Sequence, residues 1–248
     1  MRLRYSNSRR AKVACMIVFF LLALTPLVSQ ETNTSVAKAP EPGSFRAGGI
    51  SFSFPPPSDD LIEAGPDYRV LLEPFAPTTN RLVAAFMLQD DLVLLRGGKR
   101  AAMTEYALVE VPRRVEFADV TPETFKQIAD GTAAQFGANL ESKVRESVED
   151  TNRRLKELNS SIASVSVDKP VYLGVLFSKP DAHGFGASMA YSSNGTTTKV
   201  VTGVSVIRVK NRVFFAYLYK RYEDESTLLW IRKASEQWAD SILSANGH

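Results

Sequence analysis

The carboxyl-terminal third of the chain holds the pattern that most restricts its fold, a hairpin with two strongly apolar arms. The arms are Thr197–Val209 and Arg212–Lys220, and the Lys210-Asn211 loop between them suits a tight turn because Asn tolerates the left-handed conformation. Every side chain from Val213 to Tyr219 is aliphatic or aromatic, so successive residues present apolar groups to both sides of the strand. We therefore expect a central strand that is covered on both faces.

Shorter segments with strand patterns lie before and after a long helical segment. Ile50, Phe52 and Phe54 alternate with serines and lead into a proline run, where a strand ends because proline cannot donate to the ladder. A turn at Asp90-Asp91 and a short apolar piece, Leu92–Leu95, are expected between two later strands. The further predicted strands are Tyr68–Leu72, Arg81–Gln89, Glu105–Val111, Ile162–Val167, Val171–Ser178 and Phe185–Tyr191.

Two amphipathic helices are predicted. The first begins at Thr121-Pro122-Glu123, where Thr suits the N-cap, Pro the first turn and Glu the positive end of the helix dipole. Its continuation to Leu158 is highly charged, which we interpret as a solvated helix face. The second begins near Asp224 or Ser226. The stripe residues expected to be buried are Phe125, Ile128, Thr132, Phe136, Leu140, Val144 and Val148 in the first helix, and Ile231, Ala234, Trp238 and Ile242 in the second.

The order of these elements indicates an α+β fold. Strands, a long helix, further strands and a last helix differ from the strict strand–helix alternation of a parallel sheet. We expect an antiparallel twisted sheet with a long central helix and a C-terminal helix packed on it, within a single domain over residues 48–245.

The amino-terminal segment has the layout of a secretory signal peptide. A basic region is followed by an apolar run from Val13 to about Val28 and by polar residues from Ser29 onward. We predict that residues 1–30 are a cleaved signal and that residues 31–47 form a disordered linker, because that stretch offers almost nothing apolar to bury. An uncleaved membrane anchor is the alternative, and the run is shorter than the ~20 residues that span a bilayer comfortably.

Removal of the signal changes the charge balance of the chain. The full sequence has 30 basic and 27 acidic residues, and residues 1–30 hold five of the basic ones, so the remainder has 25 against 27 and a net charge of −2. This balance does not favour a nucleic-acid partner. The only cysteine, Cys15, lies within the signal, so the mature chain has no disulfide, thiol nucleophile or cysteine metal ligand.

The opening strand and the carboxyl end of the chain resemble the PsbP-like proteins and their bacterial DcrB-type relatives. The shared features are the Gly49–Pro55 strand that runs into a proline, a Val/Ile hairpin, the aromatic strand Val213–Tyr219, a Tyr222-Glu223-Asp224 exit and a closing helix that carries Trp238. The resemblance covers the order of elements over most of residues 49–244, while residues 168–196 and 139–158 depart from the family pattern. It implies an α/β/α sandwich around an antiparallel sheet, export in bacteria and no enzyme activity.

The aromatic strand supplies the strongest candidate for a binding surface. Phe214, Tyr217, Tyr219 and Tyr222 are the candidate binding residues, because Tyr in particular joins a large apolar body to a polar tip. Aromatic side chains at strand spacing also serve as ordinary core packing, which is their commoner use. Burial of these side chains would therefore decide between the two interpretations.

Catalytic and metal-binding patterns are sparse. His183 lies two residues after Asp181 and before glycines, so it is a candidate general base oriented by that carboxylate or, more simply, a loop histidine. The serines show no Gly-x-Ser-x-Gly elbow around a nucleophile. The acidic pairs Asp59-Asp60 and Asp90-Asp91 follow no EF-hand spacing, so we predict no catalytic residue, no metal site and no cofactor.

These observations favour a non-enzymatic, exported binding or accessory domain that recognises a protein partner or an apolar ligand. The expected location is the periplasm or the exterior of a bacterium, the expected partner is an envelope protein, and contact with a membrane would come only through an uncleaved signal. The alternative is a hydrolase that uses carboxylates and His183.

Overall fold

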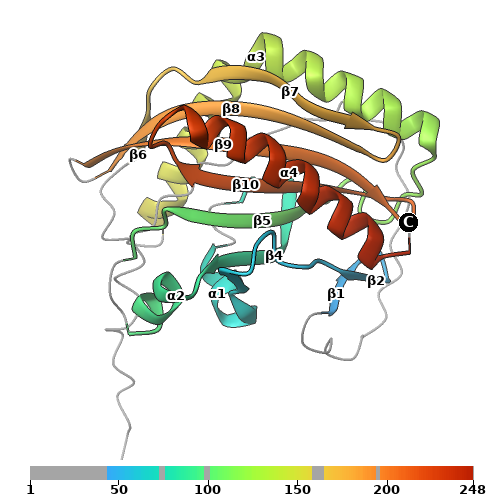
Figure 1. The fold of residues 1–248 in the computed structure, drawn as a ribbon, viewed down its shortest axis with the longest axis horizontal. Helices are drawn as coiled ribbons and strands as arrows, with labels where there is room; N and C mark the ends of the chain where they lie inside the picture. The colour runs from blue at the N-terminus through green and yellow to red at the C-terminus, as the bar shows by residue number, and fades with distance from the viewer. Residues whose placement is uncertain (1–43, 73–75, 98–100, 158–164, 194–195, 248) are drawn as a thin grey trace, which may run out of the picture.

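An eight-stranded antiparallel sheet forms the centre of the molecule (Figure 1). The computed structural model describes residues 44–72, 76–97, 101–157, 165–193 and 196–247. Along the sheet the strands are β3 (Leu61–Glu63), β4 (Asn80–Leu88), β5 (Glu105–Pro112), β10 (Arg212–Arg221), β9 (Thr196–Val209), β8 (Ala182–Ser193) and β6 (Val165–Val167), with β7 (Val171–Lys179) also paired to β8. The predicted α+β class is confirmed.

The predicted apolar hairpin is the β9–β10 pair, and β10 lies in the middle of the sheet as expected. Its turn residues, Lys210 and Asn211, have positive φ angles of 46° and 60°, the geometry of a two-residue hairpin loop that matches the strand twist. Phe215 and Tyr217 point to one face of the sheet and Phe214 to the other, and all three side chains are at most 1% exposed.

The first predicted helix is α3 (Pro122–Glu157), which covers one face of the sheet over β6, β7 and β8. Its N-cap is confirmed, because the backbone N–H of Thr124 donates to Oγ1 of Thr121 at 3.2 Å. The apolar stripe faces the sheet as predicted, with Phe125, Phe136 and Val144 each at most 3% exposed.

The last helix is α4 (Glu225–Ala245), which covers the opposite face (Figure 1). Its N-cap is Asp224, whose side chain accepts a hydrogen bond from the backbone N–H of Ser226 at 2.8 Å. Trp238 is 2% exposed, and its Nε1 donates to the carbonyl of Pro55 at 2.8 Å. The helix lies very close to β9 at Gly203, where an added Cβ would be 1.9 Å from Oγ of Ser235.

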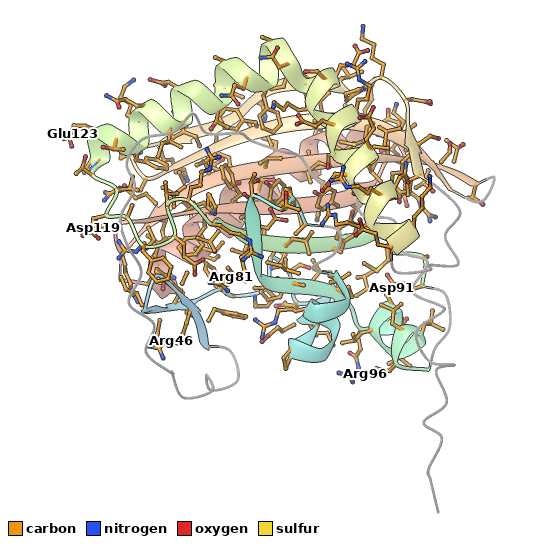
Figure 2. The ribbon with its side chains drawn as sticks, turned by 180° about the vertical axis from the view of Figure 1, so that it is seen from behind. Arg46, Arg81, Asp91, Arg96, Asp119 and Glu123 are labelled. Carbon is orange, nitrogen blue, oxygen red and sulfur yellow. The ribbon has the colours of Figure 1, made fainter. Side chains whose placement is uncertain are left out.

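A small hairpin of β1 (Ser44–Ala47) and β2 (Ile50–Ser53) packs on the α4 side of the sheet. The ring of Phe52 lies 4.7 Å from that of Phe214, centroid to centroid. Arg81 on β4 links this hairpin to the sheet. Its Nη2 donates to the carbonyl of Arg46 at 2.9 Å, and its guanidinium forms an ion pair with Glu116. Figure 2 shows Arg46 and Arg81 on neighbouring parts of this region.

Three predicted segments differ in the structure. Tyr68–Leu72 belongs to α1 (Gly65–Leu72), not to a strand, since Pro66 is suited to the first turn of a helix. Leu92–Leu95 and the Asp90-Asp91 turn belong to α2 (Gln89–Arg96), because acidic residues stabilise a helix start and the two leucines at three-residue spacing are buried on one side. The end of the predicted linker, Ser44–Ala47, is β1, where Phe45 and Ala47 are buried at alternate positions.

The predicted signal peptide and the rest of the linker lie outside the described residues. Within the part of the chain that the structure describes, no helix combines the length and the apolar character needed to cross a bilayer.

Candidate functional site

The predicted aromatic binding surface is mostly core. Phe214 and Tyr217 are fully buried and Tyr219 is 1% exposed, because β10 is a central strand with packed layers on both faces. These three residues therefore do not form a surface for a partner. Tyr222 follows the end of β10 and is partly exposed, and Nζ of Lys199 lies 3.9 Å from the centroid of its ring.

His183 lies in the β7–β8 hairpin and contacts a serine. Its Nδ1 is 3.2 Å from Oγ of Ser178, the residue directly opposite on β7. Partial burial lowers the pKa of His183 below 6.5, so the ring is neutral at pH 7. The Asp181 carboxylate, which the sequence suggested as its orienting group, accepts a hydrogen bond from Nε of Arg208 at 2.7 Å.

Within the described residues, no three His, Cys, Asp or Glu side chains are grouped so that they could jointly hold a metal ion.

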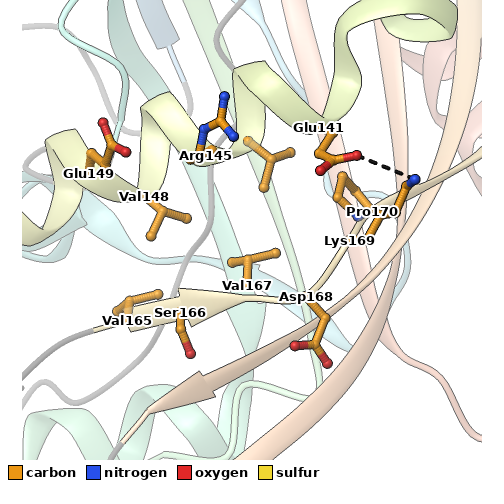
Figure 3. A pocket seen from close by; sticks show the side chains of 11 residues that line it. Glu141, Arg145, Val148, Glu149, Val165, Ser166, Val167, Asp168, Lys169 and Pro170 are labelled. Atoms are coloured by element: carbon orange, nitrogen blue, oxygen red, sulfur yellow. Dashed lines mark ion pairs between the residues drawn. The ribbon is translucent and has the colours of Figure 1, made fainter.

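A groove of about 350 Å³ lies between α3 and β6 (Figure 3). The sequence predicted both walls but not that they face one another. Its floor is aliphatic and its margins are charged. The floor residues are Val144, Val148, Val165, Val167 and Pro170, and the marginal residues are Glu141, Arg145, Glu149, Ser166, Asp168 and Lys169.

Local sequence patterns explain why the floor is apolar. Val144 and Val148 are four residues apart on α3 and therefore share one helix face. Val165 and Val167 are two residues apart on β6 and therefore share one side of the strand. Figure 3 shows Val148 and Val167 directed into the space between helix and strand. Val144 and Val165 are 2% and 4% exposed, whereas the other two valines are only partly buried, so the groove is open above them.

A side chain of α3 fixes the distance between the two walls. Oδ1 of Asn152 accepts a hydrogen bond from the backbone N–H of Val165, and Nδ2 of Asn152 donates to the carbonyl of the same residue, both at 2.8 Å. The amide thus pairs with both backbone groups of Val165, as a neighbouring strand would. It holds the free edge of β6 toward the helix.

The charged margin is partly neutralised. Nζ of Lys169 lies 3.5 Å from Oε2 of Glu141, and both side chains are well exposed, so this ion pair contributes little stability. Arg145 and Glu149 follow on the same helix, and Asp168 lies at the end of β6. Figure 3 shows the Asp168 carboxylate directed away from the helix, so it lies outside the groove.

The predicted solvated face of α3 needs one correction near its end. Asp150 is 9% exposed and forms ion pairs with Arg153 and Arg154. Nη1 of Arg154 also donates to the carbonyl of Ala76 at 2.6 Å. Asp150 and Arg154 therefore face inward and not toward solvent. In a helix of this length, some polar residues fall on the side that faces the sheet.

A buried carboxyl group lies beneath this end of the helix. Glu110 on β5 is fully buried, its Oε2 accepts a hydrogen bond from Nδ2 of Asn80 at 2.8 Å, and its Oε1 has no hydrogen-bond partner. Burial raises the pKa of Glu110 to about 8, although the Asn80 hydrogen bond and the charge of Arg154 act in the opposite direction. The neighbouring Tyr217 and Tyr219 have pKa values raised well above 10 by the same burial. The charge pattern of the sequence carried no sign of this group.

Comparisons with known proteins identify no family. No protein-family model matches the chain, and no curated protein matches it. Two similar solved structures are the Ran-binding protein Mog1p of Saccharomyces cerevisiae and a mutant of protein Mog1. The first is 14% identical, covers 80% of this chain and 88% of its own, and has a TM-score of 0.28. The second is 14% identical, covers 82% and 92%, and has the same TM-score of 0.28.

Scores this low carry no argument about this chain. The resemblance to the PsbP-like and DcrB-type proteins is not tested by these comparisons and stays a prediction.

Proposed function

We propose that this chain is an exported, non-enzymatic binding domain, and that the groove between α3 and β6 receives an apolar group of its partner. The observation that carries the proposal is the groove itself: about 350 Å³, with an aliphatic floor and a few charges at its margin. Ligand-binding sites commonly have this volume and this composition. Their apolar walls supply affinity, and a few polar groups fix the orientation of the ligand.

Occupancy of the groove can be tested with an uncharged, apolar fluorescent probe, Nile red, added to the purified protein. Val148→Asp places a carboxylate on the partly buried floor, where its desolvation opposes an apolar occupant. We expect the fluorescence enhancement to fall about tenfold in this variant. Leu229→Asp is the matched control, because Leu229 is 73% exposed on α4, which covers the opposite face of the sheet.

Two further measurements keep this test decisive. The urea midpoint of each variant shows whether it is folded, and Val148→Thr, which has a similar shape, gives a milder version of the same change. Equal probe binding by wild type, Val148→Asp and Leu229→Asp would remove the groove from consideration as the binding site.

The exported location is part of the proposal. It rests on the basic and apolar layout of residues 1–30, and it makes an envelope protein the expected partner. Intact mass of the protein isolated from its host should correspond to a chain that begins between Ser29 and Thr32. A chain that still begins at Met1 would contradict cleavage and would leave a retained anchor.

A hydrolase is the second candidate, and one contact favours it. Oγ of Ser178 lies 3.2 Å from Nδ1 of a neutral His183, the distance expected for a nucleophile and its general base. The pair is also an ordinary cross-strand neighbour in a hairpin. Labelling of Ser178 by a fluorophosphonate, abolished by His183→Ala, would support this function over the binding domain.

A further inference from the structure

We infer that the groove binds an extended peptide segment of a partner protein, which joins the sheet as an additional strand along β6. This inference rests on the proposed function and names the class of ligand for the same site.

The direction of the backbone groups on β6 follows from two independent contacts. The N–H of Asp168 donates to the carbonyl of Ala190 on β8 at 2.8 Å, so the backbone of Asp168 points toward β8. Backbone direction alternates along an antiparallel strand, which makes Val167 and Val165 point away from β8. The two hydrogen bonds between Val165 and Asn152 of α3 confirm this assignment.

The outward-facing groups of Val167 open into the groove. Because Asn152 reaches the outer edge of β6 from α3, that edge faces the helix, and the groove lies between them (Figure 3). Among the described residues, none hydrogen-bonds to the N–H or C=O of Val167. The Asn152 amide stands beside Val165 where the backbone of a neighbouring strand would lie. A partner segment at the usual strand spacing of ~4.8 Å could therefore lie next to Asn152 and pair with the backbone of Val167.

The floor determines which side chains such a segment carries. Alternate side chains of an added strand point to the same side, so one set would lie over the open part of the floor at Val148 and Val167. Those positions favour aliphatic residues, whereas the intervening positions face solvent and can be polar. A ligand of alternating aliphatic and polar residues is therefore expected, as in other complexes formed by strand addition.

The charges on the groove side of the margin balance one another. Glu141 is paired with Lys169, and Arg145 and Glu149 carry one charge of each sign. Figure 3 shows the Asp168 carboxylate directed away from the helix, so it adds no charge to the groove. The margin therefore favours a peptide segment without net charge.

The experiment selects phage-displayed random peptides of about eight residues on the purified protein, after depletion on Val148→Asp. Selected sequences are synthesised with blocked ends and measured against wild type, Val148→Asp and the control Leu229→Asp. We expect alternating aliphatic residues, a loss of affinity of about tenfold or more in Val148→Asp, and no change in the control.

Two readouts distinguish strand addition from side-chain binding alone. Backbone N-methylation of the peptide should weaken binding about tenfold at the residue paired with Val167 and have little effect at its two neighbours, because their N–H groups point away from β6. Amide hydrogen exchange of Val167 should slow about tenfold when peptide binds, while that of Val165, already bonded to Asn152, stays unchanged.

The possible failures are separable. If the fluorescent probe occupies the groove but no peptide is enriched, or if N-methylation weakens binding equally at every position or at none, the proposed function stands and strand addition is wrong. If neither probe nor peptide is sensitive to Val148→Asp, both are wrong. Concentration-dependent dimerisation that Val148→Asp abolishes would show that a second copy of this chain is the occupant, which also overturns the inference.

Discussion

Glu110 provides the sharpest test of how the core is built. Its carboxyl group is fully buried on the α3 side of β5 and accepts a hydrogen bond from Asn80. Burial raises its pKa from 4.5 to about 8, so the folded protein holds the proton at neutral pH. Glu110→Gln keeps the shape and an oxygen that accepts from Asn80, and it removes the titration.

The sign and size of the effect follow from proton linkage. Between pH 4.5 and about 8 the folded protein binds the Glu110 proton while the unfolded chain has released it, so the free energy of unfolding falls as pH rises. The slope is about 1.4 kcal/mol per pH unit, which gives a total of about 5 kcal/mol across this window. This stability is fully present below the unfolded pKa of 4.5 and is lost by the time the pH passes about 8.

Urea unfolding of wild type and Glu110→Gln at a series of pH values measures this effect directly. All other groups titrate alike in the two proteins, so the difference in unfolding free energy isolates Glu110. We expect the variant to match wild type near pH 5 and to be several kcal/mol more stable near pH 8. A difference that stays constant to within about 1 kcal/mol over this range would refute a buried, protonated Glu110.

Three further predictions concern packing and the lone histidine of the sheet. Trp238→Ala should lower the free energy of unfolding by about 3–5 kcal/mol by urea titration, and Trp238→Phe by less, because it loses mainly the hydrogen bond to Pro55. Gly203→Ala should cost about 1–3 kcal/mol, and Ser235→Ala in the same protein should recover most of it, since the clash is with a buried hydroxyl that has no hydrogen-bond partner. His183→Ala should leave the unfolding midpoint and probe binding unchanged; loss of either would show that the imidazole is needed.

The parts of the fold that the sequence predicted are those with long, regular patterns. The β9–β10 hairpin and α3 have apolar periodicity over ten residues or more, and turn or cap residues mark their ends. The segments that became α1 and α2 are eight residues each, and so short an apolar run fits a strand or a helix equally well. Packing on the sheet edge decided between the two, and that information is not local.

The candidate site was harder to predict because residue type does not reveal exposure. Tyr217 and Tyr219 have the side chains of a binding surface, yet they are stacked within the core, and the ring of Tyr219 lies 4.5 Å from that of Tyr106. The groove instead depends on valines, which sequence reasoning assigns to the core by default. Only the crossing of α3 over β6 leaves some of them open.

The length of α3 explains why a groove exists at that place. The helix has 36 residues and is about 54 Å long at ~1.5 Å per residue, whereas β6 has three residues and covers only about 10 Å at ~3.3 Å per residue. A helix that long extends well beyond β6, so the short strand covers only part of its apolar stripe. Asn152 supplies the missing strand at one backbone position, and Val167 next to it has no such partner among the described residues. A peptide segment that pairs with Val167 would bury the partly exposed side chains of Val148 and Val167. It would also form hydrogen bonds with the N–H and C=O of Val167, so one ligand would satisfy the apolar floor and the strand edge together.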